Sequence, residues 1–136
     1  MRERRCAMRH AAPVNPGLLG PALEAVAEPG GRHLDPRRLI ELTGMRVQEL
    51  AALAGVDRNT IARNPHSPKV QEAVGEVVRL LESATEVAGD LDRALLWYRH
   101  QPIEAYRFRT PAELVADGHA EAVMAYLDDL RHGTYA

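Results

Sequence analysis

The sequence predicts an all-α fold, in which an N-terminal helix-turn-helix bundle is joined by a long helix to a small C-terminal helical domain. Aromatic residues make up only 4% of the chain, and its apolar content of 46% is mostly Ala, Leu and Val. The residues that favour β-sheets are therefore scarce. Apolar residues also recur at helical spacing of three or four, and several segments open with a capping residue followed by proline.

The first 34 residues contain too many helix breakers for a long helix. These are Pro13, Pro16, Gly17, Gly20, Pro21, Pro29, Gly30 and Gly31. Residues 21–29 could still form two helical turns. We interpret residues 1–34 as a partly ordered arm, whose order would come from docking on the main body.

Regular structure is predicted from residue 35 onward. Asp35 is a good N-cap and is followed by Pro36, while Gly44 can end the helix that they begin. A second helix is expected over residues 47–54, and a third begins at Asp57 and must stop before Pro65.

A long helix follows, beginning with Ser67 as the cap and Pro68 in the first turn. One apolar stripe runs along it at the spacing of an amphipathic helix. Its members are Val70, Val74, Val77, Val78, Leu81, Ala84 and Ala88. Gly89 marks its end and Asp90 caps the next helix. Residues 35–89 are therefore interpreted as one helix-turn-helix domain with a connecting helix.

The chain after residue 90 is expected to form a separate small domain, residues 90–136. An irregular stretch is predicted over residues 101–109, and Thr110 with Glu113 can then form a capping box at the start of a short helix. Gly118 closes that helix, and the last helix runs over residues 119–133. Its predicted inward residues are Ala120, Val123, Met124, Leu127 and Leu130.

The most specific local pattern is a DNA-reading helix-turn-helix over residues 47–63. Ala51, Gly55 and Ile61 have the spacing of the small residue, turn glycine and buried apolar residue that lock two such helices together. The second helix then exposes side chains suited to base edges and phosphates. The predicted DNA contacts are Arg58, Asn59, Thr60 and Arg63, with Gln48 contacting the backbone from the preceding helix.

Charge is distributed unevenly between the two halves. Residues 1–69 carry 11 Lys+Arg and 7 Asp+Glu, whereas residues 70–136 carry 6 and 12, within a net charge of −2. The basic half is compatible with nucleic acid and the acidic half with a basic protein partner. No stretch approaches the ~20 apolar residues of a membrane span, so the protein is expected to be soluble and cytoplasmic, with no membrane partner.

The sequence offers little for catalysis or metal binding. Its histidines are His10, His33, His66, His100, His119 and His132, and no two of them have metal-ligand spacing such as H-x-x-x-H. Neither Ser67 nor Ser83 lies in a nucleophile elbow, and no phosphate-binding glycine loop is present. We therefore predict no enzyme activity, no cofactor and no metal site.

A series of landmarks follows in order from residue 94 to residue 136. The landmarks are Trp97, Pro102, Ile103, Thr110, Pro111, Glu113, Leu114, Gly118, Gly133 and Tyr135. In this order and spacing the run resembles the toxin-binding domain of the Xre-MbcA-ParS antitoxins, and with the helix-turn-helix the resemblance covers roughly residues 36–136. Phe108 and Arg109 stand where a glycine often precedes the Thr-Pro, and residues 64–68 replace a commonly found Trp.

The resemblance implies an antitoxin of a type II toxin-antitoxin pair. Its partner would be a RES-domain toxin that consumes NAD⁺, and the C-terminal segment would cover the toxin's active site. It also implies binding of operator DNA by a homodimer within a larger complex. The toxin-binding residues expected on this basis are Trp97, Arg131, His132, Gly133, Thr134, Tyr135 and Ala136.

Two readings remain open from the residues themselves. Trp97 suits a core as well as an interface, because its ring is large and amphipathic. The whole chain could also be a stand-alone helix-turn-helix repressor whose C-terminal half dimerises or senses a small molecule. An adjacent gene for a RES-like enzyme would favour the antitoxin over this alternative.

Overall fold

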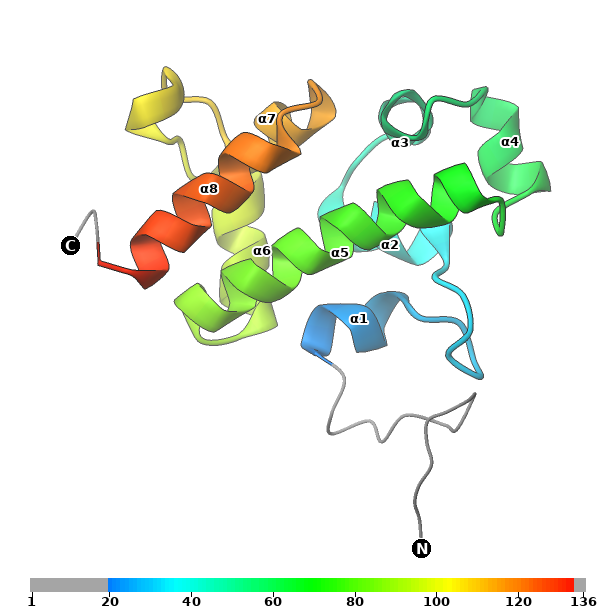
Figure 1. The fold of residues 1–136 in the computed structure, drawn as a ribbon, viewed down its shortest axis with the longest axis horizontal. Coiled ribbons are helices and arrows are strands. Elements are labelled where there is room, and N and C mark those ends of the chain that lie inside the picture. The colour runs from blue at the N-terminus through cyan, green and yellow to red at the C-terminus, as the bar shows by residue number, and fades with distance from the viewer. Residues whose placement is uncertain (1–19, 134–136) are drawn as a thin grey trace, which may run out of the picture.

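Helices arranged around one long central helix form the fold, in a computed structural model that describes residues 20–133 (Figure 1). Within this range the structure contains helices and no β-strand, so the predicted all-α class is confirmed. The elements are α1 (Pro21–Val26), α2 (Pro36–Thr43), α3 (Val47–Ala54), α4 (Arg58–Arg63), α5 (Pro68–Ala88), α6 (Leu91–His100), the 3₁₀ helix η2 (Glu104–Tyr106), α7 (Pro111–Ala116) and α8 (Ala120–Arg131).

The predicted helix starts are confirmed by their hydrogen bonds. The Asp35 carboxylate accepts from the backbone N–H of Arg37 at 2.9 Å, and the Ser67 hydroxyl accepts from that of Val70 at 3.3 Å. Thr110 and Glu113 form the expected capping box, with reciprocal bonds of 3.1 and 2.9 Å. Such caps each stabilise a helix by about 1 kcal/mol. Local sequence therefore fixes where these helices begin.

Helix α5 forms the centre of the fold, and Figure 1 shows the others gathered along its length. It contacts α1, α2, α3, α6 and α8, and the contact with α1 involves Glu82 in the second half of α5. The predicted apolar stripe is buried from Val70 to Ala84, and Ala88 is partly buried. Ala73, Leu80 and Thr85 are also buried, and a single stripe does not include them. The difference arises because neighbours cover α5 on more than one side.

Two long side chains join elements that are far apart in sequence. The Arg99 guanidinium at the end of α6 donates to the carbonyl oxygens of Leu42 at 2.7 Å and Glu41 at 3.3 Å, at the end of α2. The Glu82 carboxylate on α5 accepts from the N–H groups of Ala22 and Leu23, at 3.2 and 3.1 Å. It thereby satisfies free donors in the first turn of α1.

Helix α1 is part of the packed body, because its Ala22 and Val26 are fully buried against the common core. The remainder of the predicted arm, residues 1–19, lies outside the described residues. Among the helices of the described segment, none has the length and apolarity needed to cross a membrane.

Residues 101–109 are more ordered than the irregular stretch predicted from sequence. The backbone N–H of Ile103 donates to Arg109 O and that of Phe108 donates to Ile103 O, both at 2.9 Å, so the loop folds back on itself around η2. Arg107 and Phe108 both adopt left-handed backbone conformations, with φ of 59° and 63°. This conformation is uncommon for residues with a bulky side chain. The loop therefore holds backbone strain at two consecutive positions.

Candidate functional site

Helices α3 and α4 form the predicted helical hairpin. Leu50, Ala51 and Ile61 are buried between them and α5. Gly55 has a φ of 71°, the left-handed conformation expected at this turn, and the N–H of Val56 donates to Ala51 O at 3.0 Å. The buried residues and the turn glycine are therefore where the predicted helix-turn-helix needs them, and DNA reading by this hairpin stays a prediction.

The predicted DNA contacts lie together on the outer side of this hairpin. The Asp57 carboxylate accepts from Asn59 N–H at 2.7 Å and begins α4. Gln48, Arg58, Asn59 and Arg63 are exposed, and Thr60 is half-buried. Within residues 20–133, neither the Arg58 nor the Arg63 guanidinium has an ion-pair partner, so both are free for an external phosphate or base. Whether they contact DNA stays a prediction.

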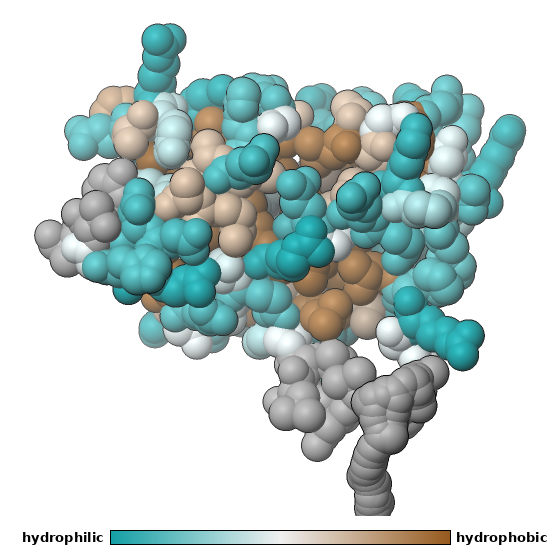
Figure 2. Space-filling view, viewed as in Figure 1, coloured by the Kyte–Doolittle hydropathy of each residue, from teal (hydrophilic) through white to brown (hydrophobic). Residues whose placement is uncertain are grey.

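The surface at the α4 end of the molecule is hydrophilic. Figure 2 shows mainly teal and pale side chains at the right-hand end, where α4 lies in Figure 1. Brown side chains gather in the middle of the view with tan ones to their left, and the left-hand side is again largely teal.

An aromatic cluster lies among α6, η2 and α8. Trp97 stacks on Tyr126 with ring centroids 6.4 Å apart and an interplanar angle of 12°, and Tyr106 meets Tyr126 edge-on at the same separation. The Tyr106 hydroxyl donates to Ala122 O at 3.3 Å. All three rings are partly buried. Trp97 thus packs within its own domain while it keeps part of its ring at the surface.

Two large apolar side chains of the same domain are mostly exposed to solvent. Leu96 on α6 is 63% exposed, and Phe108 in the strained loop is 65% exposed. Neither residue was among the toxin contacts predicted from the sequence. The available signal was that Phe108 stands where a glycine often occurs in the resembled domain. An exposed phenylalanine in a left-handed conformation is costly for the free protein, so it marks a candidate binding residue.

The end of α8 is tied to α5. Arg131 donates to Glu86 and to the Ser83 hydroxyl, both at 3.0 Å, and to Asp128 at 3.3 Å. His132 has a ring nitrogen 2.8 Å from Asp128 O, and Gly133 has a φ of 75°. Arg131, predicted as a toxin contact, is thus engaged within its own fold. The predicted contacts Thr134, Tyr135 and Ala136 lie outside the described residues.

Comparison with known families identifies the C-terminal part of the molecule. Residues 83–133 match the family model of the antitoxin Xre/MbcA/ParS C-terminal toxin-binding domain. Residues 83–133 are therefore a toxin-binding domain of the Xre/MbcA/ParS antitoxin type. The match includes the end of α5 and all of α6, η2, α7 and α8, and it confirms the resemblance seen in the sequence. Neither curated proteins nor solved structures gave a match.

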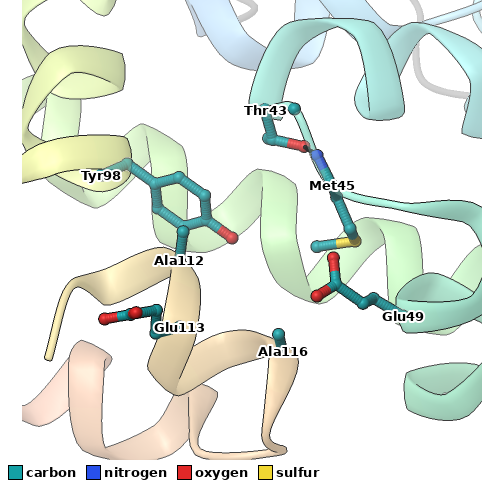
Figure 3. A pocket seen from close by; sticks show the side chains of 8 residues that line it. Thr43, Met45, Glu49, Tyr98, Ala112, Glu113 and Ala116 are labelled. Carbon is teal, nitrogen blue, oxygen red and sulfur yellow. Dashed lines mark hydrogen bonds between the residues drawn. The ribbon is translucent and has the colours of Figure 1, made fainter.

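A small cavity lies at the seam between the α2–α3 region and the toxin-binding domain. It has a volume of about 120 Å³ and is lined by Thr43, Gly44, Met45, Glu49, Tyr98, Ala112, Glu113 and Ala116 (Figure 3). Figure 3 shows the Tyr98 hydroxyl and the Glu49 carboxylate pointing into the space between α6 and α3.

Tyr98 is fully buried, and its hydroxyl has no hydrogen-bond partner among the described residues. Burial raises the pKa of this hydroxyl above its usual value, and the nearby Glu49 carboxylate adds to the rise. A buried hydroxyl without a partner costs roughly 1–3 kcal/mol relative to a satisfied one. The sequence alone could not show that the polar end of Tyr98 lacks a partner.

Proposed function

We propose that this protein is an antitoxin that binds and neutralises a cognate toxin through residues 83–136 and that it binds operator DNA through α3 and α4. The toxin would be an enzyme of the RES-domain class that consumes NAD⁺, as the family resemblance implies. The antitoxin would act in the cytoplasm as a homodimer, so that two helix-turn-helix units read two half-sites.

The observation that carries the toxin-binding part is the exposure of Phe108 and Leu96 within the matched domain. Aromatic side chains are enriched among the residues that dominate binding energy, because they bury a large area with few rotatable bonds. The half-exposed aromatic cluster around Trp97 extends this apolar region. Together they form a surface of the kind that a protein partner covers.

The strain in the same loop supports this assignment. A non-glycine residue in the left-handed region costs of order 1–3 kcal/mol, and such residues cluster at binding sites. Phe108 adopts this strained conformation although its ring is not buried in the fold. Contact with a partner would give the ring the burial that the free antitoxin lacks.

The C-terminal segment would complete the toxin contact. Gly133 has a φ of 75° after the end of α8, the left-handed conformation that commonly ends a helix. Tyr135 would supply an aromatic anchor in the toxin's cleft. The acidic balance of residues 70–136 complements a basic cleft of this kind.

The first experiment separates strain from binding in the loop 101–109. Phe108→Gly removes the ring and the strain together, so the free antitoxin should become more stable while its affinity for the toxin falls at least 10-fold. Arg107→Gly is the matched control, because it relieves the neighbouring strain and keeps the ring. It should raise stability and leave the affinity unchanged. Equal toxin affinity of Phe108→Gly and the wild type would reject this surface.

The second experiment tests the C-terminal segment. Deletion of Thr134 to Ala136 should leave folding and DNA binding intact but release the toxin, seen as a fall in cellular NAD⁺ when both proteins are co-expressed. Tyr135→Ala should give a partial effect in the same direction. Full protection of NAD⁺ by the truncated antitoxin would show that the segment does not cover the active site.

The alternative of a repressor that senses a small molecule finds less support. Its natural site would be the seam cavity, since that cavity joins the two halves. Ligand pockets usually have volumes of about 300–1,000 Å³, whereas this cavity has about 120 Å³. It has room for a few water molecules and not for a typical metabolite.

A further inference from the structure

The fold brings together three potential metal ligands that lie far from the toxin-binding domain. They are Glu28 and His33 in the loop between α1 and α2, and His66 in the turn between α4 and α5. One ligand atom from each residue lies within 4.8 Å of the others. The two imidazole rings are stacked, with centroids 3.9 Å apart and an interplanar angle of 6°. Nε2 of His66 lies 2.9 and 3.0 Å from the two oxygens of Glu28.

The loop that carries Glu28 and His33 is a tight hairpin. Ala27 and Leu34 form an isolated antiparallel bridge, and the N–H of Glu28 donates to His33 O at 2.9 Å. Gly30 and Gly31 close the turn with φ values of 93° and 72°, which favour glycine at both positions. Glu28 and His33 therefore lie opposite each other on the two sides of a turn that backbone hydrogen bonds hold closed.

Gln71 on α5 connects this hairpin to the turn that carries His66. Its side-chain amide donates to Leu34 O at 2.8 Å and to Pro65 O at 2.9 Å, and its carbonyl accepts from Leu34 N–H at 2.9 Å. Leu34 and Pro65 are the immediate neighbours of His33 and His66. One partly buried side chain thus sets the spacing between the two histidines, and such supporting contacts orient metal ligands.

The donor set decides which ion would fit. Two imidazoles and one carboxylate form a ligand set that zinc sites use, with water in the fourth position. Ca²⁺ and Mg²⁺ prefer oxygen ligands, so the two histidines disfavour both. Zinc ligand atoms lie roughly 3.3 Å apart around a tetrahedral ion with bonds of about 2.0–2.1 Å. Glu28 and His33 are half-buried and His66 is exposed, and the two rings would rotate out of their stacked arrangement so that one nitrogen of each points at the ion.

We propose that Glu28, His33 and His66 bind one Zn²⁺ ion, which links the α1–α2 loop to the turn after α4. This site lies outside residues 83–133 and is independent of the proposed toxin contact. It also revises the expectation of no metal site, since the His33 and His66 pair has no recognisable spacing in sequence. The ion would hold the C-terminal end of α4 against α1, directly beside the residues predicted to contact DNA.

Titration of Zn²⁺ into the untagged, full-length protein after chelator treatment tests the site. Isothermal calorimetry should show one Zn²⁺ per chain with a Kd of about 1 μM or tighter, and Zn²⁺ should raise the melting temperature. His33→Ala and His66→Ala should each weaken binding at least 100-fold. His119→Ala is the matched control, because His119 is exposed at the start of α8; it should bind like the wild type.

Glu28→Gln provides a variant that keeps the side-chain size if a histidine variant fails to fold. It should weaken Zn²⁺ binding about 10-fold and reduce the rise in melting temperature, with an unchanged circular dichroism spectrum. The absence of saturable binding by the wild type would overturn the proposal. Unchanged affinity in the combined His33→Ala, His66→Ala variant would also overturn it, because the ion would then bind elsewhere.

Discussion

The two ends of α5 present opposite kinds of surface, although they share one core. At its start, the helix-turn-helix exposes Arg58, Asn59 and Arg63 on short, well-capped helices. At its end, the toxin-binding domain exposes Leu96 and Phe108, the latter on a strained loop. The first surface suits a charged polymer and the second an apolar protein face. The two ends therefore differ in the side chains they expose, although they pack around one core.

The packing itself joins the two ends. Buried residues of α5 contribute to one continuous core, and Arg99 hydrogen-bonds the end of α2 across the seam. The expected behaviour is one folding unit with two independent surfaces. The predictions below test first the shared core, then each surface, and last the seam.

The largest effect is expected from Leu80→Ala, which truncates a fully buried side chain of α5. Loss of such a side chain costs about 2–5 kcal/mol, because a cavity remains. Urea unfolding should show one transition, detected equally at both ends of the molecule. Val87→Ala is the control on the same helix, since Val87 is 40% exposed, and should change stability by less than about 0.5 kcal/mol. Two separate transitions would mean that the halves fold independently.

The next effect tests the apolar surface. Phe108→Asp should weaken toxin binding roughly 100-fold, about 2–3 kcal/mol, because it places a charge where an aromatic anchor is expected. DNA affinity should stay unchanged. Val47→Asp is the matched change at the other end, because Val47 is 39% exposed at the start of α3. Val47→Asp should weaken DNA binding and leave toxin binding unchanged. If Phe108→Asp instead weakened DNA binding and Val47→Asp weakened toxin binding, the two surfaces would be assigned the wrong way round.

The polar surface is tested by Arg58→Ala. Loss of a base contact should cost about 1–3 kcal/mol and relax the sequence preference at one position, measured by salt-controlled titration with operator variants. Arg93→Ala is the control, because Arg93 is exposed in the other half and pairs with Asp90. It should leave operator affinity unaffected. If the wild type shows no preference for any operator sequence, the α3–α4 hairpin has a structural role and does not read DNA sequence.

The smallest effect concerns Tyr98 at the seam. The pKa of its hydroxyl is raised in the folded state, so its contribution to stability is complete below pH about 10 and is lost as pH rises toward the folded pKa. The free energy of unfolding should therefore fall above pH 10, by at most about 1.4 kcal/mol per pH unit. Tyr98→Phe should flatten this fall. At pH 7 the variant should be as stable as the wild type or more stable by up to about 1 kcal/mol, because it removes an unpartnered hydroxyl.

Sequence predicted the features that depend on a few consecutive residues. The caps at Asp35, Ser67 and Thr110 are confirmed, because each is a local hydrogen bond between a side chain and the following turn. The left-handed Gly55 is confirmed for the same reason. The apolar stripe of α5 was predicted in part, since periodicity finds one buried face and α5 has more than one.

The remaining features depend on contacts between distant residues. The positive φ of Phe108 follows from the closure of the loop between Ile103 and Arg109, and its one signal in the sequence was its place where a glycine often stands in the resembled domain. The approach of His33 and His66 depends on Gln71 holding two loops together. Arg131 was predicted as a toxin contact because the sequence does not show its partners on α5, which lie about 45 residues earlier.

The length of α5 sets how the two partners can share the antitoxin. Its 21 residues span about 30 Å, which is the diameter of a small domain. A toxin held at one end and an operator held at the other therefore need not compete for space. In the proposed function the helix would act as a spacer, so that one chain could hold its toxin and its operator DNA at the same time.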